Sequence, residues 1–231
     1  MTAVHIIENE YLKVVVSELG AELQSIINKK NNKEYLWQGS KEIWPRKAPV
    51  LFPIVGKVFN DTYYHEGKSY KLTQHGFARD EAFDMLMSGS QQLTFLLTEN
   101  ATTLEKYPFP FNLYIGYTLD GPKIKVLYEV QNTGETDMYF SIGGHPGFNC
   151  PLEGKGTYED YFLELPQETL EIFPLQEGGY QAGTKTTLST LGRKLNLSKN
   201  LFKNDALVFK NGEVTQVRLW NKDRNEGIGL S

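Results

Sequence analysis

Hydrophobic and polar residues alternate with a period of two along much of the chain, a pattern typical of β-strands that bury one face. Near the N terminus, Leu12, Val14 and Val16 lie on the same side of the first predicted strand. A second apolar run covers residues 21–28, and the lysine-rich segment 29–33 that follows it predicts a solvated hairpin loop. The chain is therefore expected to begin with strands joined by short turns.

The middle of the chain carries the clearest strand pattern. Residues 93–97 alternate between apolar and more polar positions. Two longer runs, 114–119 and 124–130, flank the sequence Asp120-Gly121-Pro122, which is a turn signal. These two runs are expected to pair with each other.

Shorter strands are predicted for the C-terminal third. Residues 161–165 and 170–173 have the length and composition of strands. Residues 200–209 lead into Asn211-Gly212, the strongest short hairpin signal in the chain, and 214–220 is expected to be the return strand.

No stretch of useful length shows the period of an α-helix, and the sequence has neither a repeat of fixed period nor a low-complexity linker. With 231 residues, of which 40% are hydrophobic, the chain is long enough to bury a sizeable core. The sequence therefore predicts an all-β protein with a single domain over residues 1–231.

Composition and charge narrow the function classes. Aromatic residues make up 13% of the chain, which suits both pleated sheets and the apolar faces of sugars. The net charge of −4 argues against binding to nucleic acid or to a membrane surface, both of which need a basic surface.

Cysteine usage and the N terminus indicate the compartment. The single cysteine, Cys150, excludes an intrachain disulfide framework and a cysteine-ligated zinc site. The N-terminal residues do not form a signal peptide, and no apolar run approaches the ~18 residues of a membrane span. We expect a soluble cytoplasmic protein.

The first candidate for a binding site is the proline-rich segment, residues 44–57. Three prolines, Pro45, Pro49 and Pro53, exclude a helix and disfavour a regular central strand. The segment also carries the cations Arg46 and Lys57. It is either the wall of a pocket or a well-packed irregular crossover, and its residues alone favour neither.

Two further candidates contain a histidine beside glycine. In the first, His75-Gly76 precedes Arg79, whose rigid fork of donors suits hydroxyl pairs, carboxylates or phosphates, although Asp80 could instead hold it in a structural ion pair. In the second, residues 141–149, His145 stands between a glycine pair and a proline, straight after the strand-like run 138–140. For an isolated histidine, a structural turn would be the simpler reading; the other motifs favour function.

Four motifs in this order resemble those of the aldose 1-epimerase (galactose mutarotase-like) superfamily, and within it the LacX-like branch. They are residues 46–57, 75–79, 143–149 and 201–209, and the resemblance covers essentially the whole chain. It implies a β-supersandwich of large antiparallel sheets with a sugar-binding cleft, and interconversion of the α and β anomers of a hexose or hexose 6-phosphate. The implied partner is a small sugar or sugar phosphate, with no cofactor and no metal.

The resemblance also implies roles for individual residues. His145 matches the catalytic acid, Arg46, His75 and Arg79 match cleft residues that hold sugar oxygens, and Asp205 matches an acidic sugar contact. An imidazole suits the acid because its pKa lies near neutrality and it can give and recover the same proton.

One expected residue has no match. The family's general base is a glutamate near the C terminus, in a segment of the type Cys-hydrophobic-Glu-Pro-Trp, and Asn225-Glu226-Gly227 near the end of this chain does not fit it. We therefore expect the chain to be incomplete at its C terminus, or the base to come from an unexpected position. The missing base leaves a second function open, a non-catalytic carbohydrate-binding or sensing protein on the same scaffold. The sequence does not indicate the oligomeric state.

Overall fold

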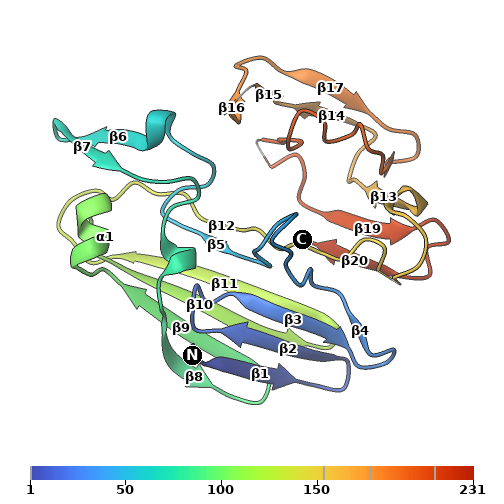
Figure 1. Cartoon of the computed structure of the whole chain (residues 1–231), viewed down its shortest axis with the longest axis horizontal. Coiled ribbons are helices and arrows are strands. Elements are labelled where there is room, and N and C mark those ends of the chain that lie inside the picture. The colour runs from blue at the N-terminus through green and yellow to red at the C-terminus, as the bar shows by residue number, and fades with distance from the viewer. Residues whose placement is uncertain (1, 153, 177, 211) are drawn as a thin grey trace. The chain divides into compact units, whose positions relative to one another are not determined.

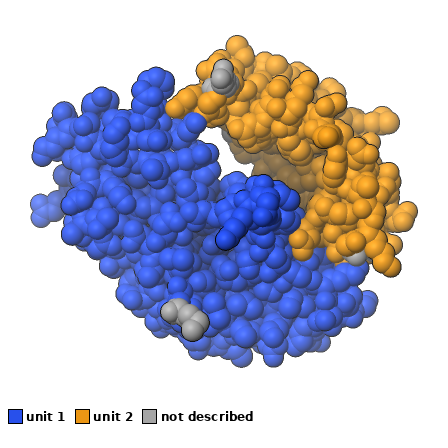
Figure 2. Space-filling model, viewed as in Figure 1, with its two compact units in different colours: residues 1–148 blue, residues 149–231 orange. Residues whose placement is uncertain are grey.

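A computed structural model describes residues 2–152, 154–176, 178–210 and 212–231. The chain divides into two compact units, residues 1–148 and residues 149–231, which Figure 2 shows in different colours. The regular secondary structure of each unit consists almost entirely of antiparallel strands, and the all-β prediction is confirmed (Figure 1). Within the described residues, no helix has the length and apolar character needed to cross a membrane.

The first unit contains two four-stranded sheets, one in the order β1-β2-β3-β4 and the other in the order β11-β10-β9-β8. The strands of the first are β1 (Val4–Glu8), β2 (Leu12–Ser17), β3 (Leu23–Asn28) and β4 (Lys33–Glu34). Those of the second are β8 (Asp84–Ser88), β9 (Gln92–Thr98), β10 (Phe111–Asp120) and β11 (Lys123–Asn132). The unit also contains β5 (Val50–Leu51), β6 (Thr62–His65), β7 (Lys68–Lys71), β12 (Gly143–Gly144), the short helix α1 (Ala101–Lys106) and the 3-10 turns Phe59–Asp61 and Ala78–Asp80.

The core of the first unit lies between these two sheets. Val14 and Val16 of β2 and Phe95 of β9 are fully buried, as their alternation with polar residues predicts. The ring of His5 in β1 meets that of Phe95 edge-on at 5.9 Å, so the inner faces of the two sheets are in contact. Burial of these apolar side chains supplies the main driving force for the unit.

A buried tyrosine ties the two sheets together. The hydroxyl of Tyr117 in β10 donates a hydrogen bond of 2.7 Å to the carbonyl of Ala21, just before β3. Tyr117→Phe is expected to lower the free energy of unfolding by about 1–3 kcal/mol, because it leaves a buried carbonyl without a donor. Urea unfolding measures this, with Tyr64→Phe as the control; Tyr64 is 77% exposed, so its change should stay within about 0.5 kcal/mol. Equal effects of the two substitutions would contradict the role of Tyr117.

A second apolar cluster supports the irregular segments. The ring of Phe52, which follows β5, lies 5.1 Å from that of Phe111 and 5.9–6.2 Å from those of Phe77, Tyr107 and Phe140. Phe52, Phe77 and Phe111 are buried. Because aromatic rings of this size fill the interior, the proline-rich segment has a fixed position without forming a regular strand.

The second unit has one four-stranded sheet in the order β18-β13-β19-β20, and two strand pairs, β14-β17 and β15-β16. Its strands are β13 (Tyr161–Glu164), β14 (Thr169–Ile172), β15 (Leu175–Gln176), β16 (Tyr180–Gln181), β17 (Thr186–Ser189), β18 (Lys194–Asn196), β19 (Val217–Asn221) and β20 (Gly227–Leu230), and a 3-10 turn covers Tyr158–Asp160. The predicted strands at 161–165 and 170–173 correspond to β13 and β14.

Three details of the strand and helix prediction are wrong. Residues 138–140 are not a strand; the paired residues are Gly143–Gly144, two positions before His145. Residues 200–209 are turns and irregular chain, and β19 pairs with β13 and β20 instead; Asn211 of the predicted hairpin lies outside the described residues. Helix α1 was missed, although Asn100 and Thr103 form a capping box at its start.

Candidate functional site

The short pair β5-β12 brings two of the sequence motifs together. Val50 faces Gly144 and Leu51 faces Gly143 across this pair. On the C-terminal side of β12, the backbone N–H of His145 donates to the carbonyl of Pro49 at 3.1 Å. His145 therefore lies beside the proline-rich segment.

Glycines let the backbone around His145 approach its neighbours closely. A Cβ at Gly144 would lie 2.5 Å from the hydroxyl oxygen of Tyr128, and a Cβ at Gly147 would lie 2.8 Å from the Trp44 ring. The Trp44 ring in turn lies 5.0 Å from the imidazole of His145. The side chain of His145 is exposed, so its imidazole combines a fixed backbone with access from solvent.

The segment that contains the second histidine, residues 75–79, is hydrogen-bonded to the backbone of Phe52. The carbonyl of Phe52 accepts hydrogen bonds from the N–H groups of Phe77 and Ala78, at 3.0 and 3.1 Å. His75 and Gly76 both have positive φ, +68° and +70°, and this reversal turns the chain back onto the proline-rich segment.

Gly56 fixes the orientation of the His75 ring. The N–H of His75 donates to the carbonyl of Gly56 at 2.7 Å, and the N–H of Gly56 donates to Nδ1 of His75 at 3.0 Å. Since Nδ1 accepts a hydrogen bond, the neutral ring carries its proton on Nε2. The rings of His75 and His145 are 5.8 Å apart and nearly perpendicular. The two histidines that are far apart in sequence therefore form one site in the first unit.

The surroundings of His75 favour its neutral form. Burial lowers the pKa of His75 below its usual value of 6.5, and the nearby charges of Arg79 and His145 lower it further. Because the unfolded chain takes up the proton more readily, the folded protein is expected to lose stability as the pH falls below 6.5 and to stop losing it below the folded pKa. NMR titration of the ring signals should give a midpoint below 6.5 with the proton on Nε2, and His75→Gln should remove this component of the acid sensitivity. A midpoint at or above 6.5 would contradict the assigned environment.

Two arginines meet at Asp80. Arg46 Nη2 donates to Asp80 Oδ1 at 2.7 Å, and Arg79 Nε lies 3.7 Å from Asp80 Oδ2. Arg79 also donates through Nη2 to the carbonyl of Gln74 at 2.7 Å. The structural ion pair and the cleft role, which the sequence left as alternatives for Arg79, are therefore compatible.

One donor of Arg79 is buried without a hydrogen bond. Its Nε is buried and makes no hydrogen bond to any described residue. Burial and the charge of Arg46 lower the pKa of Arg79, and the opposite effects of Asp80 and Glu22 are smaller. Arginine nevertheless stays charged at neutral pH. The carboxylate nearest to this donor is Asp80, whose Oδ2 lies 3.7 Å away.

Asp205, the fifth predicted site residue, belongs to the second unit. It has φ of +75°, and its Oδ1 accepts a hydrogen bond of 2.8 Å from the N–H of Ala206. It lines a pocket of about 340 Å³ together with Lys203 and Asn204. Its contact with sugar stays a prediction.

A pocket of about 390 Å³ in the first unit has a different character. Its wall is largely aromatic and includes Tyr63, Tyr107 and Phe109, and the described residues that line it do not include His75 or His145. Burial raises the pKa of Tyr63 to about 12, so its hydroxyl stays protonated and donates to the carbonyl of Lys106 at 2.9 Å. Because the polar chemistry lies around the two histidines, we place the candidate site there.

Several site residues were not predicted. Trp44 lies against His145, Gly56 orients His75, and Asp80 holds Arg46. Their types carry no signal for these roles, since each contact joins segments far apart in the sequence. No carboxylate of the described residues lies within 4.0 Å of a ring nitrogen of His75 or His145, and no group of three or more potential metal ligands was found among them.

Comparison with known proteins identifies the family. The aldose 1-epimerase family model matches residues 3–228. Protein LacX (chromosomal) from Lactococcus lactis subsp. lactis is 37% identical over 97% of this chain and 77% of its own length. Galactose mutarotase from Sus scrofa is 28% identical over 68% of this chain and 49% of its own length.

Solved structures show the same fold. The galactose mutarotase related enzyme from Lactobacillus acidophilus is 36% identical, with a TM-score of 0.91 over 99% of this chain and 76% of that one. A galactose mutarotase-like protein from Lactobacillus casei is 34% identical, with a TM-score of 0.89 over 98% of this chain and 78% of that one. The predicted galactose mutarotase-like fold is confirmed, and the chain belongs to the aldose 1-epimerase family.

Proposed function

We propose that this protein interconverts the α and β anomers of a hexose or hexose 6-phosphate, with His145 as the general acid. The observation that carries the proposal is the pairing of the exposed His145 imidazole with the His75 ring, 5.8 Å away, beside the arginines held by Asp80. Ring opening of a sugar needs a proton donor and several hydrogen-bond donors around one ring, and these residues offer both.

The reaction moves two protons. A general base removes the proton of the anomeric hydroxyl while His145 donates a proton to the ring oxygen, so that the bond between C1 and the ring oxygen breaks and an aldehyde forms. Rotation about the C1–C2 bond exposes the other face of the aldehyde. On reclosure the C5 hydroxyl adds to C1 and returns its proton to His145, while the protonated base gives its proton to the aldehyde oxygen, so that the other anomer forms and both residues regain their starting states. No redox partner or covalent intermediate is needed.

The remaining residues position the sugar in this proposal. His75 donates from Nε2, because its Nδ1 is occupied by Gly56. Arg79, whose side chain is 18% exposed, and Arg46 offer guanidinium N–H groups that are not engaged by Gln74 and Asp80. Fixed donors of this kind hold sugar hydroxyls without reorganising during the reaction. The general base is not assigned to a residue of this chain.

Polarimetry tests this function. Freshly dissolved α-glucose, α-galactose and a hexose 6-phosphate should relax to anomeric equilibrium faster in proportion to the protein concentration. Acceleration of one sugar over the others would identify the substrate. No acceleration of any of them, with protein that is folded by circular dichroism, would contradict the proposal.

The second function, non-catalytic carbohydrate binding, is favoured by one observation: none of the described carboxylates lies within 4.0 Å of either site histidine. Calorimetry alongside polarimetry separates the two. Saturable binding of a sugar that leaves its anomer exchange at the buffer rate would support a binding or sensing protein. Binding with acceleration would support the epimerase.

A further inference from the structure

A carboxylate in the second unit is surrounded by arginines. Glu164, the last residue of β13, is only 11% exposed, and three guanidinium groups point at it. Arg224 Nη2 lies 3.0 Å from Oε1, Arg193 Nη2 lies 3.8 Å from Oε1, and Arg218 Nη1 lies 3.7 Å from Oε2. The indole N–H of Trp220 also donates to Oε2, at 3.0 Å. Glu164 is therefore held as an anion, and it is poorly suited to accept a proton.

The strand register concentrates positive charge at this point. Glu164 is paired with Lys194 of β18 on one side and with Arg218 of β19 on the other, so all three side chains share one face of the sheet. On the same face, the Lys194 ammonium lies 4.9 Å and the Arg224 guanidinium 5.3 Å from the centre of the Phe162 ring. Three guanidinium groups thus surround one carboxylate, and the Lys194 ammonium lies on the same face of the sheet.

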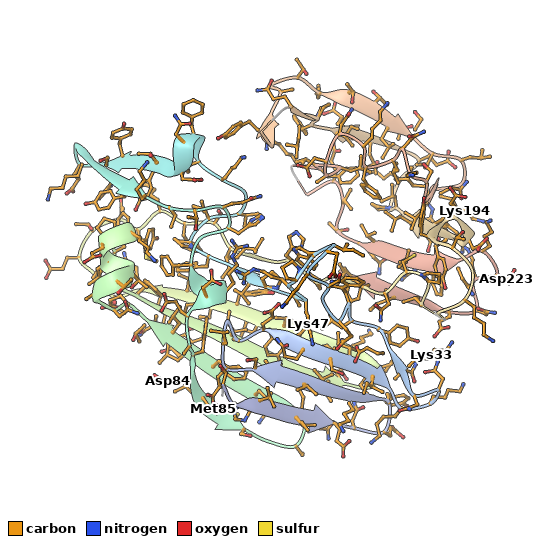
Figure 3. All side chains as sticks on the ribbon, in the orientation of Figure 1. Lys33, Lys47, Asp84, Met85, Lys194 and Asp223 are labelled. Atoms are coloured by element: carbon orange, nitrogen blue, oxygen red, sulfur yellow. The ribbon has the colours of Figure 1, made fainter. Side chains whose placement is uncertain are left out.

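Nearby acidic residues do not balance these charges. Asp160 is paired with Lys222 at 3.1 Å, and Asp223 lies in the turn between β19 and β20. Figure 3 marks Lys194 and Asp223, the sequence neighbours of Arg193 and Arg224. Among the described residues, Glu164 is the one carboxylate that lies within 4.0 Å of the guanidinium groups of Arg193, Arg218 and Arg224.

Two of the arginines have donors to spare. Of the three arginines, only Arg224 is within hydrogen-bond distance of Glu164. The guanidinium groups of Arg193 and Arg218 make no hydrogen bond to any described residue, and their side chains are 53% and 46% exposed. Each guanidinium has five N–H donors in a flat fork that matches the oxygens of a phosphate.

The backbone holds two of these arginines in an uncommon conformation. Arg193 and Arg224 have φ of +61° and +54°, in the left-handed region where residues other than glycine are uncommon. Arg193 lies in the tight turn before β18, and its carbonyl accepts a hydrogen bond of 2.9 Å from the N–H of Leu165. Strained positions of this kind are frequent at ligand sites.

We propose that Arg193, Arg218 and Arg224 form a binding site for a phosphate group of a small molecule. A second oxyanion would use the free donors of Arg193 and Arg218 and would reduce the repulsion among the guanidinium groups. The cluster is confined to the surroundings of one carboxylate in one sheet, and the whole chain has a net charge of −4, which favours a small anion over a nucleic acid. The site does not depend on the proposed epimerase function.

NMR of the whole chain labelled with nitrogen-15 tests the site. The chain has three tryptophans, and Trp220→Phe assigns the indole signal that reports on Glu164. Inorganic phosphate, added at constant ionic strength with sodium chloride, should shift the Trp220 signal to saturation and leave those of Trp37 and Trp44 in place. A shift that does not saturate, or one that chloride alone reproduces, would overturn the proposal.

Matched variants locate the binding. The double variant Arg193→Gln/Arg218→Gln should weaken phosphate binding about tenfold or more, since it removes two of the three guanidinium groups that would donate charge-assisted hydrogen bonds to the anion. Lys185→Gln removes one positive charge from the same unit, where Lys185 pairs with Glu171, and should change the dissociation constant less than about twofold. If the double variant does not fold, phosphate binding is measured with Arg193→Gln alone. This variant should fold, because the Arg193 side chain is on an exposed turn. An unchanged dissociation constant in the folded variant would overturn the site.

Titration with different phosphate compounds shows whether the site binds free phosphate, a sugar phosphate or both. Inorganic phosphate and a hexose 6-phosphate should compete for the same shift, whereas the neutral hexose should not produce it. A response to the hexose 6-phosphate without any response to inorganic phosphate would contradict a site that recognises the phosphate group itself.

Discussion

Replacing His145 with glutamine is expected to slow catalysed anomer exchange by about 10²- to 10⁴-fold, the range usual for loss of a general acid. Glutamine keeps a hydrogen-bonding side chain of similar reach but cannot give up a proton at neutral pH. The backbone of this segment is held by the pair β5-β12 and by the hydrogen bond from His145 N–H to Pro49, neither of which needs the imidazole. The variant should therefore fold and should still bind sugar.

His5→Gln is the matched control for this substitution. His5 belongs to β1 of the same unit and contacts Glu18 at 2.9 Å, a contact that glutamine can keep. Anomer exchange measured by polarimetry should be unchanged in this variant. A rate for His145→Gln within twofold of the unsubstituted protein would exclude His145 as the acid.

Replacing Gly76 with alanine is expected to destabilise the first unit by about 3 kcal/mol or more. The added Cβ would lie 2.2 Å from the carbonyl oxygen of Phe52 and 2.7 Å from Cδ of Pro53, and neither group can move freely. The left-handed φ of +70° adds about 1–2 kcal/mol for any residue with a Cβ. Since His75 is the preceding residue, the substitution should also displace the candidate site.

Gly67→Ala separates the steric overlap of the added Cβ from the cost of the left-handed backbone conformation. Gly67 has a similar φ of +75°, in the hairpin between β6 and β7, but a Cβ there would meet nothing within 4 Å. Urea unfolding should show a loss of only about 1–2 kcal/mol for Gly67→Ala. Equal losses in the two variants would show that backbone conformation alone limits Gly76.

The fold could be predicted wherever one pattern dominated. The strands β2, β9, β10 and β11 were predicted because apolar residues recur at every second position along them and the turn residues between β10 and β11 are unambiguous. The predicted strand at 200–209 failed because an apolar run does not specify pairing; in the structure, β19 finds its partners in β13 and β20. Helix α1 has six residues, too few for a helical period to emerge.

The candidate site could be predicted in part. Histidine next to glycine marked His75 and His145, and the family resemblance joined them to Arg46 and Arg79 as one site, which the structure brings together in the first unit. The roles of Gly56 and Asp80 depend on contacts between distant segments, which a single sequence does not encode in any local pattern. The cluster around Glu164 could not be predicted for the same reason, because Arg218 lies beside Glu164 only through the pairing of β13 with β19.

The proposal that sugar binds between His75 and His145 is tested most directly by NMR of the histidine rings during titration with the sugar that polarimetry selects. The chain has four histidines, so each ring can be assigned by single substitution. We expect saturable shifts of the His75 and His145 ring signals, with a common dissociation constant, and no shift of His5. Saturable sugar binding that leaves the rings of His75 and His145 unchanged would contradict the proposal.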